Sequence, residues 1–201
     1  MSYDVQIHHV PQQAFAAIRD RANIHDIGDR IMTLLSEVWD VLKNAEVRHT
    51  GHNVVLYWDE PGTALLLTDE GVPIEVGVQV VTPFKRMGRV VCAAIPGGTV
   101  ATVVLKGLYQ KLSEAHTAVR RWCAEHDYAL AGPNWEIYGD WTDNSAELRT
   151  DVFYLLRESE QHALEQSQSL TEQLSNRTGN VEVRAGLDTN GLHRHCQRRD
   201  P

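Results

Sequence analysis

Two stretches of the chain carry apolar residues at the three- and four-residue spacing of an amphipathic helix. The first spans residues 27–44, follows the capping residue Asp26 and has Asp29 in its first turn. The second spans residues 107–126. Each pattern predicts a helix with one buried face. On the first helix that face consists of Ile27, Ile31, Leu34, Leu35, Val38 and Leu42.

Around these helices lie short runs of β-branched and other apolar residues, separated by turn residues, as is typical of strands. The predicted strands are residues 3–10, 53–58, 64–68, 72–81, 88–95, 98–105, 134–140 and 149–156. Two helices cannot cover both faces of an eight-stranded sheet. We therefore predict an α+β fold in which both main helices lie on one face of a mainly antiparallel sheet.

The sequence contains an internal repeat at an offset of 81 residues. Residues 50–59 and 131–140 share a Gly, an Asn, a Tyr and an Asp at equivalent positions, and the same offset aligns the apolar positions of the two predicted helices. Two similar modules, about residues 1–81 and 82–157, are therefore predicted within one domain. Residues 158–201 are rich in polar side chains and are predicted to form a flexible C-terminal extension.

Composition and charge narrow the class of protein. Of the 201 residues, 42% are hydrophobic and 23% are charged, which is ordinary for a soluble globular protein. The formal net charge of −8 argues against direct DNA binding, because phosphate contacts need a Lys/Arg surface. With neither a signal segment nor an apolar run long enough to span a membrane, the sequence predicts a cytoplasmic protein without membrane contact.

No metal site and no cofactor are expected. The Gly-rich segment 95–99 lacks the spacing of a phosphate-binding loop and is interpreted as a hairpin turn. His193, His195 and Cys196 lie in the predicted extension without rigid partner ligands. The three cysteines show no CxxC spacing and are expected to be reduced thiols.

Glu136 is the clearest candidate for a functional residue. Its counterpart in the repeat is Val55, so a position that is apolar in one module holds a carboxylate in the other. Strand alternation places Glu136 on one face with Tyr138, and Val55 with Tyr57. A half-buried carboxylate needs a partner charge, a hydrogen bond or a cationic ligand. The alternative, a Glu136 that faces the surface or pairs with Arg120, stays open at this point.

Aromatic residues on the predicted strands and helices are the second candidate. Packing explains most of them, yet several around one carboxylate form a binding site for a flat cation through cation–π contacts. Ser113 and His116 share a helix face without the motif of a catalytic triad, and both are expected at the surface. The ligand-binding residues predicted with Glu136 are Tyr138, Tyr57, Tyr109, Trp39 and Trp135.

Several segments in order along residues 3–156 carry a resemblance to a known family. They are Ala94–Gly98, Lys106–Leu112, Trp122, Gly132–Tyr138 and Thr150–Val152. This series resembles the GyrI-like small-molecule-binding domain, also known as the effector-binding domain of AraC-type and MerR-type regulators. The resemblance implies duplicated strand-helix-strand-strand modules and a site for hydrophobic, often cationic compounds between them. The family's buried Glu in the Gly-Pro-x-x-Glu-x-Tyr segment corresponds to Glu136.

Three functional hypotheses follow from the residues and the resemblance. The first is a stand-alone protein that senses or sequesters hydrophobic or cationic aromatic compounds through Glu136. The second is a hydrolase that opens the cyclopropane ring of DNA-alkylating natural products, with Glu136 as its catalytic residue. The third is an interaction module that contacts DNA gyrase or a regulator. Regulators of this family carry a helix-turn-helix before the domain; since the first predicted strand begins almost at Met1, no direct DNA binding is expected.

Overall fold

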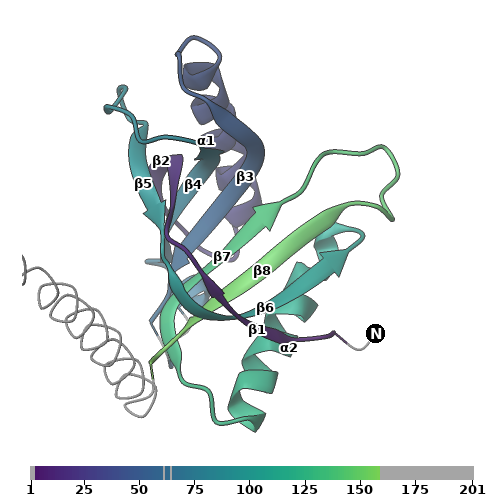
Figure 1. The fold of residues 1–201 in the computed structure, drawn as a ribbon. Helices are drawn as coiled ribbons and strands as arrows, with labels where there is room; N and C mark the ends of the chain where they lie inside the picture. The colour runs from purple at the N-terminus through teal and green to yellow at the C-terminus, as the bar shows by residue number, and fades with distance from the viewer. Residues whose placement is uncertain (1–2, 61, 64, 159–201) are drawn as a thin grey trace, which may run out of the picture. The chain divides into compact units, whose positions relative to one another are not determined.

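The computed structural model describes residues 3–60, 62–63 and 65–158. Contacts group Met1–Arg157 into one compact unit, shown in Figure 1. Apart from Glu158, the predicted C-terminal extension lies outside the described residues. The strands are β1 (Gln6–Val10), β2 (Gln13–Ala22), β3 (His49–Trp58), β4 (Val72–Val80), β5 (Val91–Ile95), β6 (Gly98–Lys106), β7 (Leu130–Tyr138) and β8 (Arg149–Leu156). The helices are α1 (Ile27–Leu42) and α2 (Leu112–Glu125), with short 3₁₀ turns η1 (Leu65–Leu67) and η2 (Tyr109–Lys111).

All eight strands form one antiparallel sheet in the order β1-β6-β8-β7-β3-β4-β2-β5. The two modules are β2-α1-β3-β4 and β6-α2-β7-β8, and they meet at the central pair β3–β7. From this centre outward, each module has the same strand order. The predicted α+β fold with duplicated strand-helix-strand-strand modules is therefore confirmed.

Each module also receives an edge strand from the other half of the sequence. Strand β1 precedes β2 along the chain but pairs with β6, and β5 precedes β6 but pairs with β2. Each of these edge strands connects to the next strand through two residues, Pro11–Gln12 and Pro96–Gly97. The two edge strands are thus exchanged between the modules.

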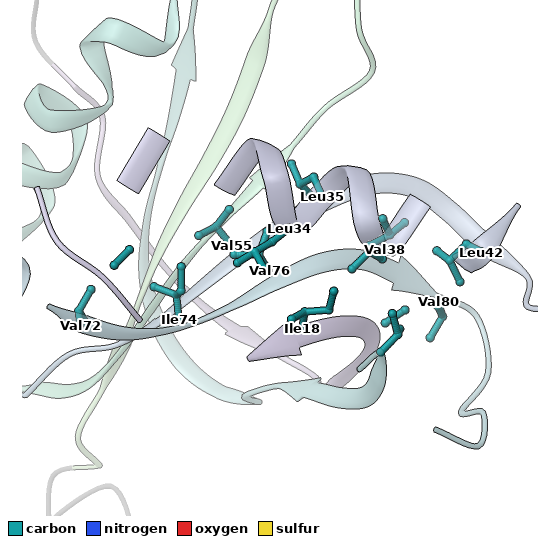
Figure 2. Close-up of a cluster of buried hydrophobic side chains, with 14 residues drawn as sticks. Ile18, Leu34, Leu35, Val38, Leu42, Val55, Val72, Ile74, Val76 and Val80 are labelled. Carbon is teal, nitrogen blue, oxygen red and sulfur yellow. The ribbon is translucent and has the colours of Figure 1, made fainter. Parts of the chain in front are cut away.

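Both helices lie on the same face of the sheet. Helix α1 is amphipathic, and its buried side chains Leu34, Leu35, Val38 and Leu42 pack on inward-facing residues of β2, β3 and β4 (Figure 2). Helix α2 packs its buried residues Ala115, Val119 and Cys123 on β6 and β8. Complete burial of an aliphatic side chain stabilises the fold by about 1.5–3 kcal/mol. None of the helices in the described part is long and apolar enough to cross a membrane.

Close backbone approach requires glycine at two positions. A Cβ on Gly77 of β4 would lie 1.7 Å from the carbonyl oxygen of Ala16 in β2. A Cβ on Gly97, in the turn before β6, would lie 2.5 Å from the backbone nitrogen of Gln12. The second approach shows that the two short connections of the exchanged strands lie against each other.

One strand was missed and one strand prediction was wrong. Strand β2 was not predicted, because its alanines and its Arg19-Asp20-Arg21 segment are not typical of a strand and because Phe15–Ile18 are buried without alternation. The predicted strand 64–68 contains instead the 3₁₀ turn η1, whose Leu65 and Leu66 pack on the cluster under α1.

Candidate functional site

Glu136 lies two residues before the end of the central strand β7 and faces the helices. Its neighbours in the sheet are Val55 on β3 and Val152 on β8. Only 3% of its surface is exposed. A buried carboxylate is costly unless hydrogen bonds compensate for the lost hydration, so its partners define the site.

Two tyrosines from equivalent positions of the repeat donate to this one carboxylate. Strands β3 and β7 pair about Val55 and Glu136, so Tyr57 and Tyr138 flank the pair on the helix-facing side. The Tyr57 hydroxyl donates to Glu136 Oε1 at 3.3 Å, and the Tyr138 hydroxyl donates to Oε2. The predicted common face of these three side chains is therefore present.

The third partner is His116, and the expectation that it lies at the surface was wrong. The His116 side chain is only 15% exposed, and its Nε2 lies 2.7 Å from Glu136 Oε1. On the other side of the ring, Nδ1 lies 2.8 Å from the hydroxyl of Tyr154 on β8. The partner of Glu136 is thus an imidazole, and Arg120, the alternative partner considered above, is an exposed residue one turn further along α2.

This polar network exists in one module only. At the repeat offset, His116 corresponds to Leu35, just as Glu136 corresponds to Val55. In the second module, Tyr154 on β8 pairs in register with Asn134 on β7. In the first module, the equivalent pair is Val78 on β4 with Asn53 on β3. The same three places in the first module therefore form a packed apolar cluster that includes Leu35, Val55 and Val78. Comparing the two helices at this offset would have singled out His116 from the sequence.

Burial keeps the phenols of this network protonated. It raises the pKa of Tyr57 and of Tyr138 well above the usual value, and the nearby charge of Glu136 raises both further. Burial likewise raises the pKa of Tyr154, against an opposing effect of the Arg120 charge. Both tyrosines bonded to Glu136 therefore remain donors over the physiological pH range.

The donor count leaves Glu136 with spare capacity. A carboxylate has about four acceptor positions, and Tyr57, Tyr138 and His116 occupy three of them. Beside Tyr138 on β8, the buried Thr150 hydroxyl has no hydrogen-bond partner among the residues that the structure describes. The site thus offers one carboxylate position and one buried hydroxyl to an additional group.

Two further predicted residues lie near this network. The Tyr109 ring packs edge-on against Tyr138 at a centroid distance of 5.4 Å and is 37% exposed. Trp39 on α1 packs on the same apolar cluster as Tyr57 and Tyr138, and its Nε1 donates to Asn53 Oδ1 at 2.9 Å. Tyr109 thus contacts a tyrosine that donates to Glu136, whereas Trp39 is linked to this group of residues through Asn53 and the shared apolar cluster.

Trp135 is not brought to this group of residues. It follows Asn134 and precedes Glu136 on β7, so its side chain lies on the opposite face of the sheet. There it is 1% exposed and stacks on Phe153 at a centroid distance of 5.3 Å. This position favours a packing role for Trp135.

Replacing Trp135 with phenylalanine is expected to lower the free energy of unfolding by about 1–2 kcal/mol, because it leaves a small cavity against Phe153. Chemical denaturation measures this loss. The ligand preference of the folded variant is expected to equal that of the wild type. A folded Trp135→Phe variant with altered ligand preference would place Trp135 in the binding site after all.

Hydroxyl groups and aromatic rings surround the Glu136 carboxylate. Among the described residues, no group of three or more His, Cys, Asp or Glu side chains has the geometry to hold a metal. A single carboxylate with aromatic neighbours provides instead one counter-charge and several π faces.

Comparisons with known proteins agree with this fold. A family model described as the GyrI-like small molecule binding domain matches residues 3–157. Among proteins with curated descriptions, none matches the chain.

Solved structures share the fold at low sequence identity. The C-terminal domain of EcmrR aligns at a TM-score of 0.67 and 20% identity, over 79% of this chain and 100% of that domain. EcmrR in its complex with DNA aligns at 0.67 and 22% identity, over 79% of this chain and 59% of the EcmrR chain. SAV2435 bound to tetraphenylphosphonium aligns at 0.57 and 10% identity, over 79% and 99% of the two chains.

Proposed function

This chain belongs to the GyrI-like small molecule binding domain family, and from that membership we propose that it binds hydrophobic aromatic cations, with Glu136 as the group that recognises positive charge. One observation carries the proposal. A buried carboxylate, held by two tyrosines and a histidine, occupies a place that is apolar in the other module. Packing alone does not require this polar network, because the first module fills the same place with Leu35, Val55 and Val78.

The rings near Glu136 provide the hydrophobic part of the proposed site. Tyr57, Tyr138, Tyr109 and Trp39 contribute aromatic surface, and aromatic faces attract organic cations by about 0.5–2 kcal/mol each. Binding of this kind is sufficient for a protein that senses or sequesters such compounds, because neither role needs a chemical step.

A titration with two probes of similar size tests the proposal. The cation is tetraphenylphosphonium, which SAV2435 binds in its solved structure, and the neutral counterpart is triphenylphosphine oxide. Isothermal titration calorimetry on the full chain is expected to show at least roughly tenfold tighter binding of the cation, since only the cation gains from the Glu136 charge. Equal affinity for both probes, or no binding of either, would contradict the proposal.

Hydrolysis is the second candidate, and the chain of contacts from Glu136 through His116 to Tyr154 favours it. A carboxylate that orients an imidazole is a common arrangement for proton transfer in catalysis. The test is incubation with an electrophile that contains a strained cyclopropane ring, followed by mass spectrometry. Product that forms no faster than in buffer would leave binding alone as the function.

A further inference from the structure

Within the part of the chain that the structure describes, His116 is the one partner of Glu136 that is able to carry a positive charge. Its Nε2 lies 2.7 Å from Glu136 Oε1, and neither side chain is more than 15% exposed. The ring is packed edge-on between Tyr57 and Tyr154, at centroid distances of 6.3 Å and 5.7 Å. The imidazole is therefore an internal hydrogen-bond partner of the carboxylate.

The hydrogen bonds of His116 suit both of its charge states. In the neutral ring, Nε2–H donates to Glu136 and Nδ1 accepts from the Tyr154 hydroxyl. In the charged ring, Nδ1–H donates to the same hydroxyl, which then acts as an acceptor. Protonation of His116 consequently breaks neither contact.

Other titratable groups lie close to His116 or to its partners. They are Tyr57 on β3, Asp59 directly after that strand, Tyr138 and Glu136 on β7, Tyr154 on β8, Tyr109 on η2 and Arg120 on α2. The phenols stay neutral, because burial raises their pKa values, and arginine stays charged. Histidine is the side chain whose charge ordinarily changes between about pH 5 and 8.

We propose that His116 determines the ligand charge that the Glu136 site accepts, an inference that rests on the proposed function. The charged form of His116 neutralises Glu136 and competes with a cationic ligand. When the imidazole is charged, the Glu136–His116 pair has no net charge and offers an incoming cation little attraction. When the imidazole is neutral, the pair has a net charge of −1, and a cation provides the missing counter-charge. Neutral aromatic ligands gain nothing from this change.

The experiment measures affinity against pH for the full chain. Tetraphenylphosphonium is titrated between about pH 5.5 and 8, with triphenylphosphine oxide as the neutral reference. The wild-type affinity for the cation is expected to rise roughly tenfold over this range, because a positive charge on His116 and a bound cation disfavour each other. Affinity for the neutral probe is expected to stay constant.

Two substitutions assign the effect to His116. His116→Gln keeps a donor that cannot become charged, and His116→Leu introduces the residue that the first module has in this place, Leu35. Both variants are expected to bind the cation with an affinity that changes little with pH. The control is His52→Gln, which removes an exposed histidine near Asp140 and is expected to keep the wild-type pH dependence.

Proton release provides a readout that does not depend on any variant. Calorimetry in two buffers of different ionisation enthalpy is expected to show protons released when the cation binds near pH 6 and none near pH 8. An unchanged pH dependence in a folded His116→Gln protein, or no proton release by the wild type, would overturn the inference and leave cation binding intact. A wild type that binds no cation at any pH would instead refute the proposed function.

Discussion

A Glu136→Gln variant is expected to bind tetraphenylphosphonium roughly 30-fold or more weakly than the wild type, because loss of one partner of a buried charge pair costs about 2–5 kcal/mol. The substitution keeps the size of the side chain, removes its charge and replaces one of its two acceptor oxygens with an NH2 donor. Affinity for triphenylphosphine oxide is expected to change little. Calorimetric titration of both probes therefore separates loss of charge recognition from loss of the site.

The chain contains a matched control for this substitution. Glu75 is also a buried glutamate, 6% exposed, but it lies on the opposite face of the sheet and pairs with Arg19 at 2.9 Å. Glu75→Gln is expected to leave the preference for the cation unchanged. If both variants lost this preference, or if Glu136→Gln kept it while folded, Glu136 would not be the charge-recognising group.

A Gly77→Ala variant is expected to lose more than about 4 kcal/mol of folding free energy, a loss that few single substitutions cause. The added Cβ would lie 1.7 Å from the Ala16 carbonyl oxygen and 2.8 Å from the Ala17 Cα, and both of these are backbone atoms. No rotation of a side chain relieves such a contact. Strands β2 and β4 would have to separate at a point where the core is fully buried. Thermal or urea unfolding measures the loss.

Gly28 provides the control for the glycine substitution. It lies in the first turn of α1, and a Cβ there meets no atom within 4 Å. Gly28→Ala is expected to leave stability unchanged or to raise it by up to about 1 kcal/mol, because alanine favours the helix. A Gly77→Ala protein as stable as Gly28→Ala would show that β2 can move away from β4 at little cost.

Most of the fold could be predicted from the sequence, because the same pattern of apolar and polar residues occurs in both modules. The apolar positions of α1 and α2 follow helical spacing in both copies, and the β3 and β7 segments share residues at one offset. The missed strand β2 shows the limit of such patterns. Its central residues are buried on both faces of the sheet, where they pack on residues that are distant in the sequence. This reason is tertiary and is not visible in the local sequence.

Part of the candidate site could be predicted from local features of the sequence, and the rest depends on tertiary packing. Strand alternation and the repeat are local features, and they placed Glu136, Tyr57 and Tyr138 on one face, where the structure has them. The contact of His116 with Glu136 joins a helix to a strand and depends on how α2 lies on the sheet. His116 was predicted to lie at the surface because it lies beside the buried stripe of α2, although its counterpart in the first module is the apolar Leu35. The binding roles of these residues stay predictions.

The exchange of β1 and β5 between the modules couples the unfolding of one module to that of the other. If the second module were to unfold alone, β1 would lose its partner β6, and β5, which the second half of the sequence supplies, would leave β2 with an unpaired edge. Unfolding the first module would strip β1 from β6 in the same way. These pairings join residues far apart in the chain, so the domain has a high contact order and folding must close long loops before they form. The exchanged strands therefore make the two modules one cooperative folding unit, with little room for partial opening of either half.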